Sequence, residues 1–155
     1  MAKTLIVTGG GEEWSSLFSD ITKKKKEDLV ILRSCGSVIL QPYGCLMRNI
    51  ILAIYTENAD EIVMIGERDR TENNVSKEML WDKIQQTGVT KRVIHTINYT
   101  DVVNHDVLQW LAGPHDSYEI MRNNIERIKK HPLIPKSIDV HGYMVNRSGE
   151  FEKWR

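Results

Sequence analysis

Hydrophobic residues fall into two alternating kinds of segment along the chain. The first kind is short and rich in Val, Ile and Leu, which predicts buried strands. These strands are expected over residues 4–8, 29–34 and 61–66. The second kind carries apolar residues at helical spacing, which predicts amphipathic or buried helices. These helices are expected over residues 14–26, 46–57 and 75–88.

Two further helices are expected in the second half of the chain. Residues 101–112 have a helical pattern that Gly113 stops. Asp116 and Glu119 have the spacing of a capping box, which predicts that a helix begins there and runs towards Lys130.

The remaining segments complete the expected fold. Residues 89–99 fit either a short strand over VIHTI or an irregular connection. Segments 138–145 and 150–154, joined by a short polar turn, predict a hairpin. Because strands that alternate with helices form parallel sheets, we expect an α/β fold. It consists of a mostly parallel β-sheet flanked by helices, with a C-terminal hairpin, in one domain over residues 1–155.

Composition narrows the classes of function. Basic and acidic residues both number 21 among 155 residues, so no broad field favours nucleic acid or an anionic membrane. No run reaches the roughly 18 to 20 apolar residues that a spanning helix needs, and we expect a cytoplasmic protein. Cys35 and Cys45 lack CxxC spacing and are interpreted as free buried thiols.

Candidate chemistry gathers where the first three strands end. Gly9, Gly10 and Gly11 follow the first strand, and residues 33–36 and 67–70 follow the second and third. Ligands of open α/β sheets bind at this carboxyl edge, so we expect the three clusters to converge there.

Several stretches carry a resemblance to one family. They are NNIERIKKHPLIPKSIDVHGYMVNRSGEFEKW (123–154), RSCG (33–36), RNIILAI (48–54) and ADEIVMIGERDR (59–70). In shared order and spacing the chain resembles the β-class carbonic anhydrases, especially their small compact members, from about Lys3 to Trp154. The resemblance implies that family's fold and a homodimer.

The resemblance also implies a zinc site, at which this sequence departs from the family pattern. The family binds zinc through C-x-D-x-R after the first strand and H-x-x-C after the third, with the Asp and Arg as a dyad. Gly9, Gly11 and Glu13 stand at the first motif, and Glu67 and Arg70 at the second. We therefore expect no zinc cofactor, no confident catalytic residue, and a binding, regulatory or scaffold role rather than an enzyme.

Two other metal arrangements remain open from the sequence. Cys35 could join a histidine, from among His95, His105, His115, His131 and His141, in a relocated zinc site. Such a site would make the chain an active carbonate dehydratase that interconverts CO2 and bicarbonate. Glu12, Glu67 and Asp69 could instead offer oxygen ligands to magnesium or manganese.

Three hypotheses describe the altered pocket without its metal. In the first, salt bridges of Arg70 with Glu67 or Glu13 fill an inert site. In the second, the Gly9–Gly11 amides bind a small anion such as bicarbonate. The arginines that could assist in anion binding are Arg33, Arg68 and Arg70. In the third, a carboxylate acts as acid or base in a different reaction. The candidates are Glu12, Glu13, Glu67 and Asp69.

Overall fold

The computed structural model describes residues 2–35, 41–68, 75–103 and 106–155. The chain divides into two compact units, one formed by residues 1–69 and 116–155 and the other by residues 70–115. The expected single domain over the whole chain stays a prediction. No helix among the described residues is both long and apolar enough to span a membrane.

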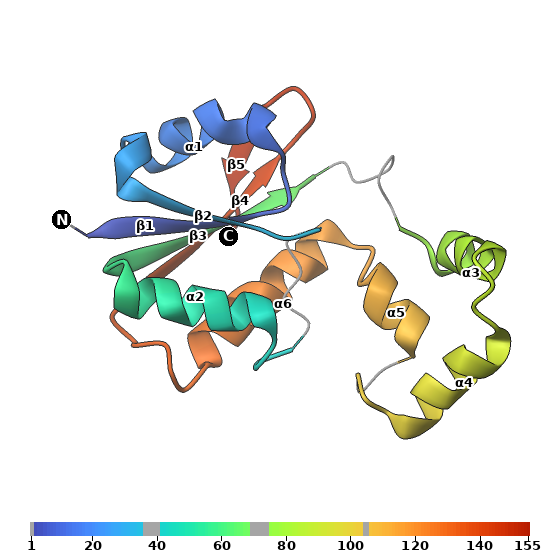
Figure 1. Ribbon diagram of the computed structural model, residues 1–155. Coiled ribbons are helices and arrows are strands. Elements are labelled where there is room, and N and C mark those ends of the chain that lie inside the picture. Colours follow the sequence, from blue (N-terminus) through green and yellow to red (C-terminus); the bar gives the residue numbers. More distant parts are fainter. Residues whose placement is uncertain (1, 36–40, 69–74, 104–105) are drawn as a thin grey trace. The chain divides into compact units, whose positions relative to one another are not determined.

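The first unit is built around one five-stranded sheet (Figure 1). Its strands are β1 (Lys3–Thr8), β2 (Leu29–Arg33), β3 (Ala59–Glu67), β4 (Asp139–Val145) and β5 (Phe151–Lys153). They lie in the order β2-β1-β3-β4-β5, in which the first four are parallel and β5 pairs antiparallel with β4. The predicted α/β fold and closing hairpin are confirmed.

Helices cover both faces of this sheet. Successive side chains of β1 point to opposite faces and are buried, so both faces have to be covered. They are α1 (Ser15–Thr22), α2 (Cys45–Thr56) and α6 (Ser117–Lys130), together with the short 3-10 turns η1 (Glu12–Trp14) and η2 (Lys26–Asp28). Ile6 packs in a cluster with Phe18 of α1, whereas Leu5 and Val7 pack with Ile50 of α2 on the opposite face. Figure 1 shows α1 on one side of the sheet and α2 and α6 on the other.

Local contacts determine where two helices of this unit begin or end. The Asp116 carboxylate accepts the backbone N–H groups of Tyr118 and Glu119, so α6 begins where the capping residue predicts. The helix expected over 14–26 is shorter than predicted, because Lys23, at φ 57°, follows Thr22 in the left-handed region and ends α1 there.

The second unit contains α3 (Lys77–Gln86), α4 (Lys91–Thr100) and α5 (Val107–Ala112). Here two predictions are wrong. The segment 89–99 lies largely in a helix rather than a strand or an irregular connection, and the helix expected over 101–112 begins only at Val107. Asp101 ends α4 in the left-handed region, and the Asp106 carboxylate caps the next helix. Asp101 and Asp106, both within the helix expected over 101–112, therefore mark the end of α4 and the start of α5.

Candidate functional site at the carboxyl edge of the sheet

The glycine loop begins directly after β1 and is held by the strand that precedes it. Thr8 is fully buried, and its hydroxyl oxygen accepts the backbone N–H of Gly10 at 3.0 Å. Ser34, after β2, donates its backbone N–H to the Thr8 carbonyl at 3.0 Å. The first turn of the loop is thus fixed by hydrogen bonds from inside the protein.

Arg33 fixes the same loop from the neighbouring strand. Its Nε donates to the Gly10 carbonyl at 3.2 Å, and its guanidinium carbon lies 6.0 Å from the centre of the Phe18 ring. The ends of β1 and β2 therefore converge as predicted. Gly10 now has a partner for its N–H and another for its carbonyl, so this residue offers no free amide to a bound anion.

Side chains from the following turn cover the glycines. A Cβ added to Gly10 would overlap the Trp14 ring, and one added to Gly11 would overlap the Glu13 carboxylate. Trp14 also packs against the Phe18 cluster, which ties the ring to the core. An anion at this loop would meet the negative charge of Glu13, a contact that opposes binding.

The third strand ends beside β4 and the hairpin. Glu67, the last residue of β3, lies opposite Val145 in the parallel register. Arg68 donates its backbone N–H to the Val145 carbonyl at 2.8 Å, and its Nη1 lies 3.7 Å from Oε1 of Glu152 on β5. Arg68 therefore pairs with the hairpin. Asp69 and Arg70, and with them the salt-bridge hypothesis and part of the anion site, lie outside the described residues.

The residues that the resemblance places at the family's ligand positions do not fit zinc. Gly9 has no side-chain donor atom, and Glu67 supplies a single carboxylate where a tetrahedral site takes three or four protein ligands. Within the described ranges, no group of three His, Cys, Asp or Glu residues is placed to hold a metal ion. The guanidinium of Arg70, whatever its position, has no lone pair to donate.

Cys35, the cysteine proposed for a relocated site, is free and exposed, and so is Cys45. Their predicted burial is wrong, because Cys35 follows the edge strand β2 and Cys45 opens α2, where side chains reach solvent.

Two of the candidate histidines already have partners. His131 is buried, with Nε2 2.9 Å from the Pro42 carbonyl and Nδ1 accepting the Leu133 N–H at 3.2 Å. Both of its ring nitrogens are therefore occupied by protein groups. Nε2 of His141 faces Glu61 at 3.8 Å, whereas His95 and His115 are exposed and His105 lies outside the described residues.

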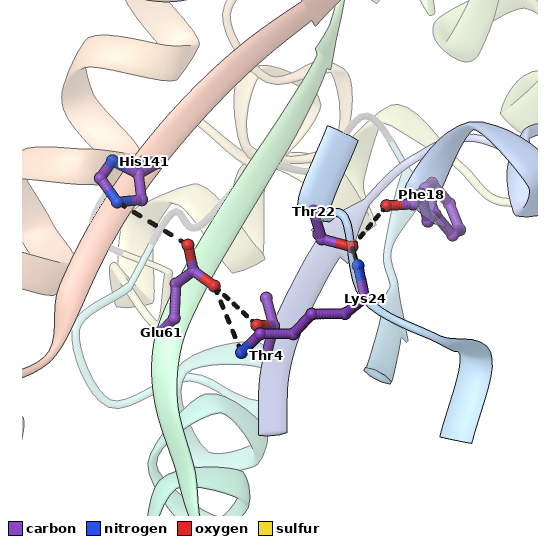
Figure 2. Close-up of polar contacts among 6 residues, drawn as sticks. All are labelled: Thr4, Phe18, Thr22, Lys24, Glu61 and His141. Atoms are coloured by element: carbon purple, nitrogen blue, oxygen red, sulfur yellow. Dashed lines mark hydrogen bonds and ion pairs between the residues drawn. The ribbon is translucent and has the colours of Figure 1, made fainter. Parts of the chain in front are cut away.

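At the opposite, amino edge of the sheet lies a polar cluster that the sequence analysis missed. Figure 2 shows the Glu61 carboxylate between Thr4, Lys24 and His141. Thr4 donates its hydroxyl to Oε2 at 2.6 Å, Lys24 Nζ lies 3.7 Å from the same oxygen, and His141 Nε2 lies 3.8 Å from Oε1. The sequence signal for it is weak: Thr4, Glu61 and His141 are polar residues near the starts of β1, β3 and β4, and Lys24 follows α1.

Comparisons with known proteins agree with the fold. No family model matches the sequence. "Putative carbonic anhydrase YtiB" of Bacillus subtilis is 35% identical over 120 residues, which are 77% of this chain and 62% of that protein. "Putative carbonic anhydrase-like protein YbcF" of the same organism is 28% identical over 153 residues, which are 95% of this chain and 83% of that protein. The chain thus spans less than two thirds of the length of YtiB.

Solved structures give the same picture of the fold. The β-carbonic anhydrase isoform I of Trichomonas vaginalis superposes with a TM-score of 0.76 at 18% identity, and the match covers 98% of this chain and 83% of that one. The sheet order, the helices on both faces and the relatives in sequence together identify the chain as a β-carbonic-anhydrase-like protein.

Proposed function

We propose that this protein has lost the zinc site of the carbonic anhydrases, does not catalyse CO2 hydration, and serves a binding, regulatory or scaffold role. The observation that carries the proposal is the glycine loop. A ligand position without a donor atom, Gly9, is followed by Gly10, whose polar groups are both used by Thr8 and Arg33.

The chemistry of the family's reaction makes the donor set decisive. Fast hydration at neutral pH needs a hydroxide nucleophile, and a bound zinc ion supplies it by lowering the pKa of its water to ~7. Glycine donates nothing and arginine stays protonated, so the family's three ligand positions retain one carboxylate, Glu67. A single carboxylate, whether it binds through one oxygen or through both, does not replace the three protein ligands that hold zinc.

The test combines metal analysis with stopped-flow CO2 hydration on protein incubated with zinc and then desalted. We expect far less than one zinc per chain and no hydration above the buffer rate. The matched positive control is the triple variant Gly9→Cys, Glu67→His, Arg70→Cys, which restores the family's ligand types and is expected to retain zinc. One zinc per chain in the unmodified protein, together with fast hydration, would overturn the proposal.

We also propose that the chain forms a homodimer, as the resemblance to the family implies.

A further inference from the structure

A pocket lies at the amino edge of the sheet, at the opposite edge from the glycine loop. It has a volume of about 470 Å³ and is formed by the end of α6, the first residues of β4 and the connection between them. Small-molecule sites commonly have volumes of ~300–1,000 Å³. The lining includes two lysines, Lys129 and Lys136, and one carboxylate, Asp139. The pocket therefore offers charged groups of both signs to a ligand of small-molecule size.

The strand that forms one wall of this pocket has open backbone groups. β5 pairs with residues 143–145 of β4, and Trp154 donates its backbone N–H to the Gly142 carbonyl at 2.8 Å. Because backbone groups alternate between the two sides of a strand, Val140 directs its N–H and its carbonyl to the same outer side as Gly142. No described residue pairs with Val140 on that side. One hydrogen-bond donor and one acceptor are thus available at the pocket wall.

The two lysines supply positive charge from the end of α6 and the connection that follows it. Lys136 donates from Nζ to the Lys129 carbonyl at 2.6 Å, which holds one ammonium group at the end of the helix. Neither lysine side chain forms an ion pair with another described residue. Both charges are therefore available to acidic groups of a ligand.

Asp139 supplies negative charge from the other face of β4. Val140 packs against the cluster that contains residues of α6, so the neighbouring Asp139 points to the opposite face. There it lies beside Glu61 in the parallel register, and Glu61 already has cationic partners (Figure 2). Within the described ranges Asp139 forms no ion pair. A cationic group of a ligand would provide its missing counter-charge.

We propose that this pocket binds a free acidic α-amino acid. The α-ammonium group donates to the Val140 carbonyl and to Asp139, and the α-carboxylate accepts the Val140 N–H, as one residue added to the sheet would do. Lys129 and Lys136 attract the α-carboxylate and the side-chain carboxylate. Two lysines and one aspartate carry a net charge of about +1, which complements the net charge of about −1 of such a ligand at neutral pH.

The open stretch of β4 also limits the size of the ligand. Between the connection from α6 and Gly142, Val140 is the one strand residue with outward backbone groups, so a single amino acid fits the edge better than a peptide strand. The site lies at the other edge of the sheet from the glycine loop. It therefore goes beyond the proposed loss of zinc and does not depend on it.

Isothermal titration calorimetry of the unmodified chain tests the charge pattern of the ligand. We expect L-glutamate or L-aspartate to bind. Glutarate lacks the ammonium group and L-norvaline lacks the side-chain carboxylate, so each should bind at least about tenfold more weakly than L-glutamate. No heat of binding from either acidic amino acid at millimolar concentration would overturn the proposal. Glutarate that binds as tightly as L-glutamate would also overturn it, because the pocket would then be a simple anion site.

Substitutions place the binding in this pocket. Lys129→Gln and Asp139→Asn change exposed side chains of opposite charge, and each should weaken the binding of L-glutamate at least about tenfold with an unchanged circular dichroism spectrum. Lys130→Gln is the matched control, because Lys130 is the next residue of α6, pairs with Glu126 and lies outside this pocket. It should bind L-glutamate like the unmodified chain. An equal loss for Lys130→Gln, or no loss for the two pocket variants, would overturn the site, while the metal analysis decides the loss of zinc separately.

Discussion

The two ends of the same parallel sheet are organised by different kinds of contact. At the carboxyl end, Thr8 and Arg33 hold the two backbone polar groups of Gly10, and Trp14 covers its carbon. At the amino end, one carboxylate, Glu61, collects a hydroxyl and two cationic or ionisable side chains. In the first arrangement side chains hold backbone groups, and in the second side chains contact one another.

This difference bears on the proposed loss of the zinc site. Ligands of open α/β sheets gather at the carboxyl end, yet here the side chains of Thr8 and Arg33 already occupy the polar groups of Gly10. Close backbone contacts tolerate little change of shape, because buried groups lose their partners when displaced. Partly exposed ion pairs tolerate more, because solvent screens them. Substitutions should therefore cost more at the carboxyl end than at the amino end.

The largest effect is expected for Gly10→Ala. The added methyl group would overlap the Trp14 ring, which cannot retreat without leaving the Phe18 cluster. Overpacking of this kind costs about 3 kcal/mol, and Tm should fall by several degrees. Gly11→Ala is the matched control, because its methyl group meets only the exposed Glu13 carboxylate, which can rotate away. Equal losses for the two variants in thermal unfolding would show that Trp14 does not fix the loop.

Sequence patterns predicted the local parts of this structure well. The strands follow from hydrophobic runs, the start of α6 from Asp116, and the position of the glycine loop from the end of β1. Such signals lie within a few residues of the structure that they determine.

The errors and omissions arise from contacts between distant residues. Thr4 meets Glu61 across 57 positions of sequence, and only the register of β1 on β3 brings them together. In α4, β-branched residues such as Val93 and Ile97 favour a strand by propensity, but the segment is helical. Residue propensity predicts secondary structure poorly where tertiary packing determines it. The partners of a side chain on a strand depend on the register between strands.

The second prediction concerns the hydroxyl that holds the glycine loop. Thr8→Val keeps the volume of the side chain but leaves the Gly10 N–H without its buried acceptor. An unsatisfied buried donor costs about 2 kcal/mol in the free energy of unfolding, measured by urea denaturation. Thr4→Val on the same strand is the control, since Thr4 is equally buried but Glu61 keeps its other partners. A greater loss for Thr4→Val would reverse the proposed ranking of the two ends.

The smallest effect is expected for Glu61→Gln at the amino end. The amide oxygen can still accept the Thr4 hydroxyl, so the substitution removes mainly the attraction to Lys24 and His141. Both ion-pair distances are close to 4 Å and the Glu61 side chain is 27% exposed, so the loss should stay below about 1 kcal/mol. Screening makes the effect dependent on salt. The difference in the free energy of unfolding from the unmodified protein, measured by urea denaturation, should therefore shrink between about 0.05 M and about 1 M NaCl. A loss that is both larger than that of Thr8→Val and insensitive to salt would mean that Glu61 acts as a buried structural group, and the distinction between the two ends would fail.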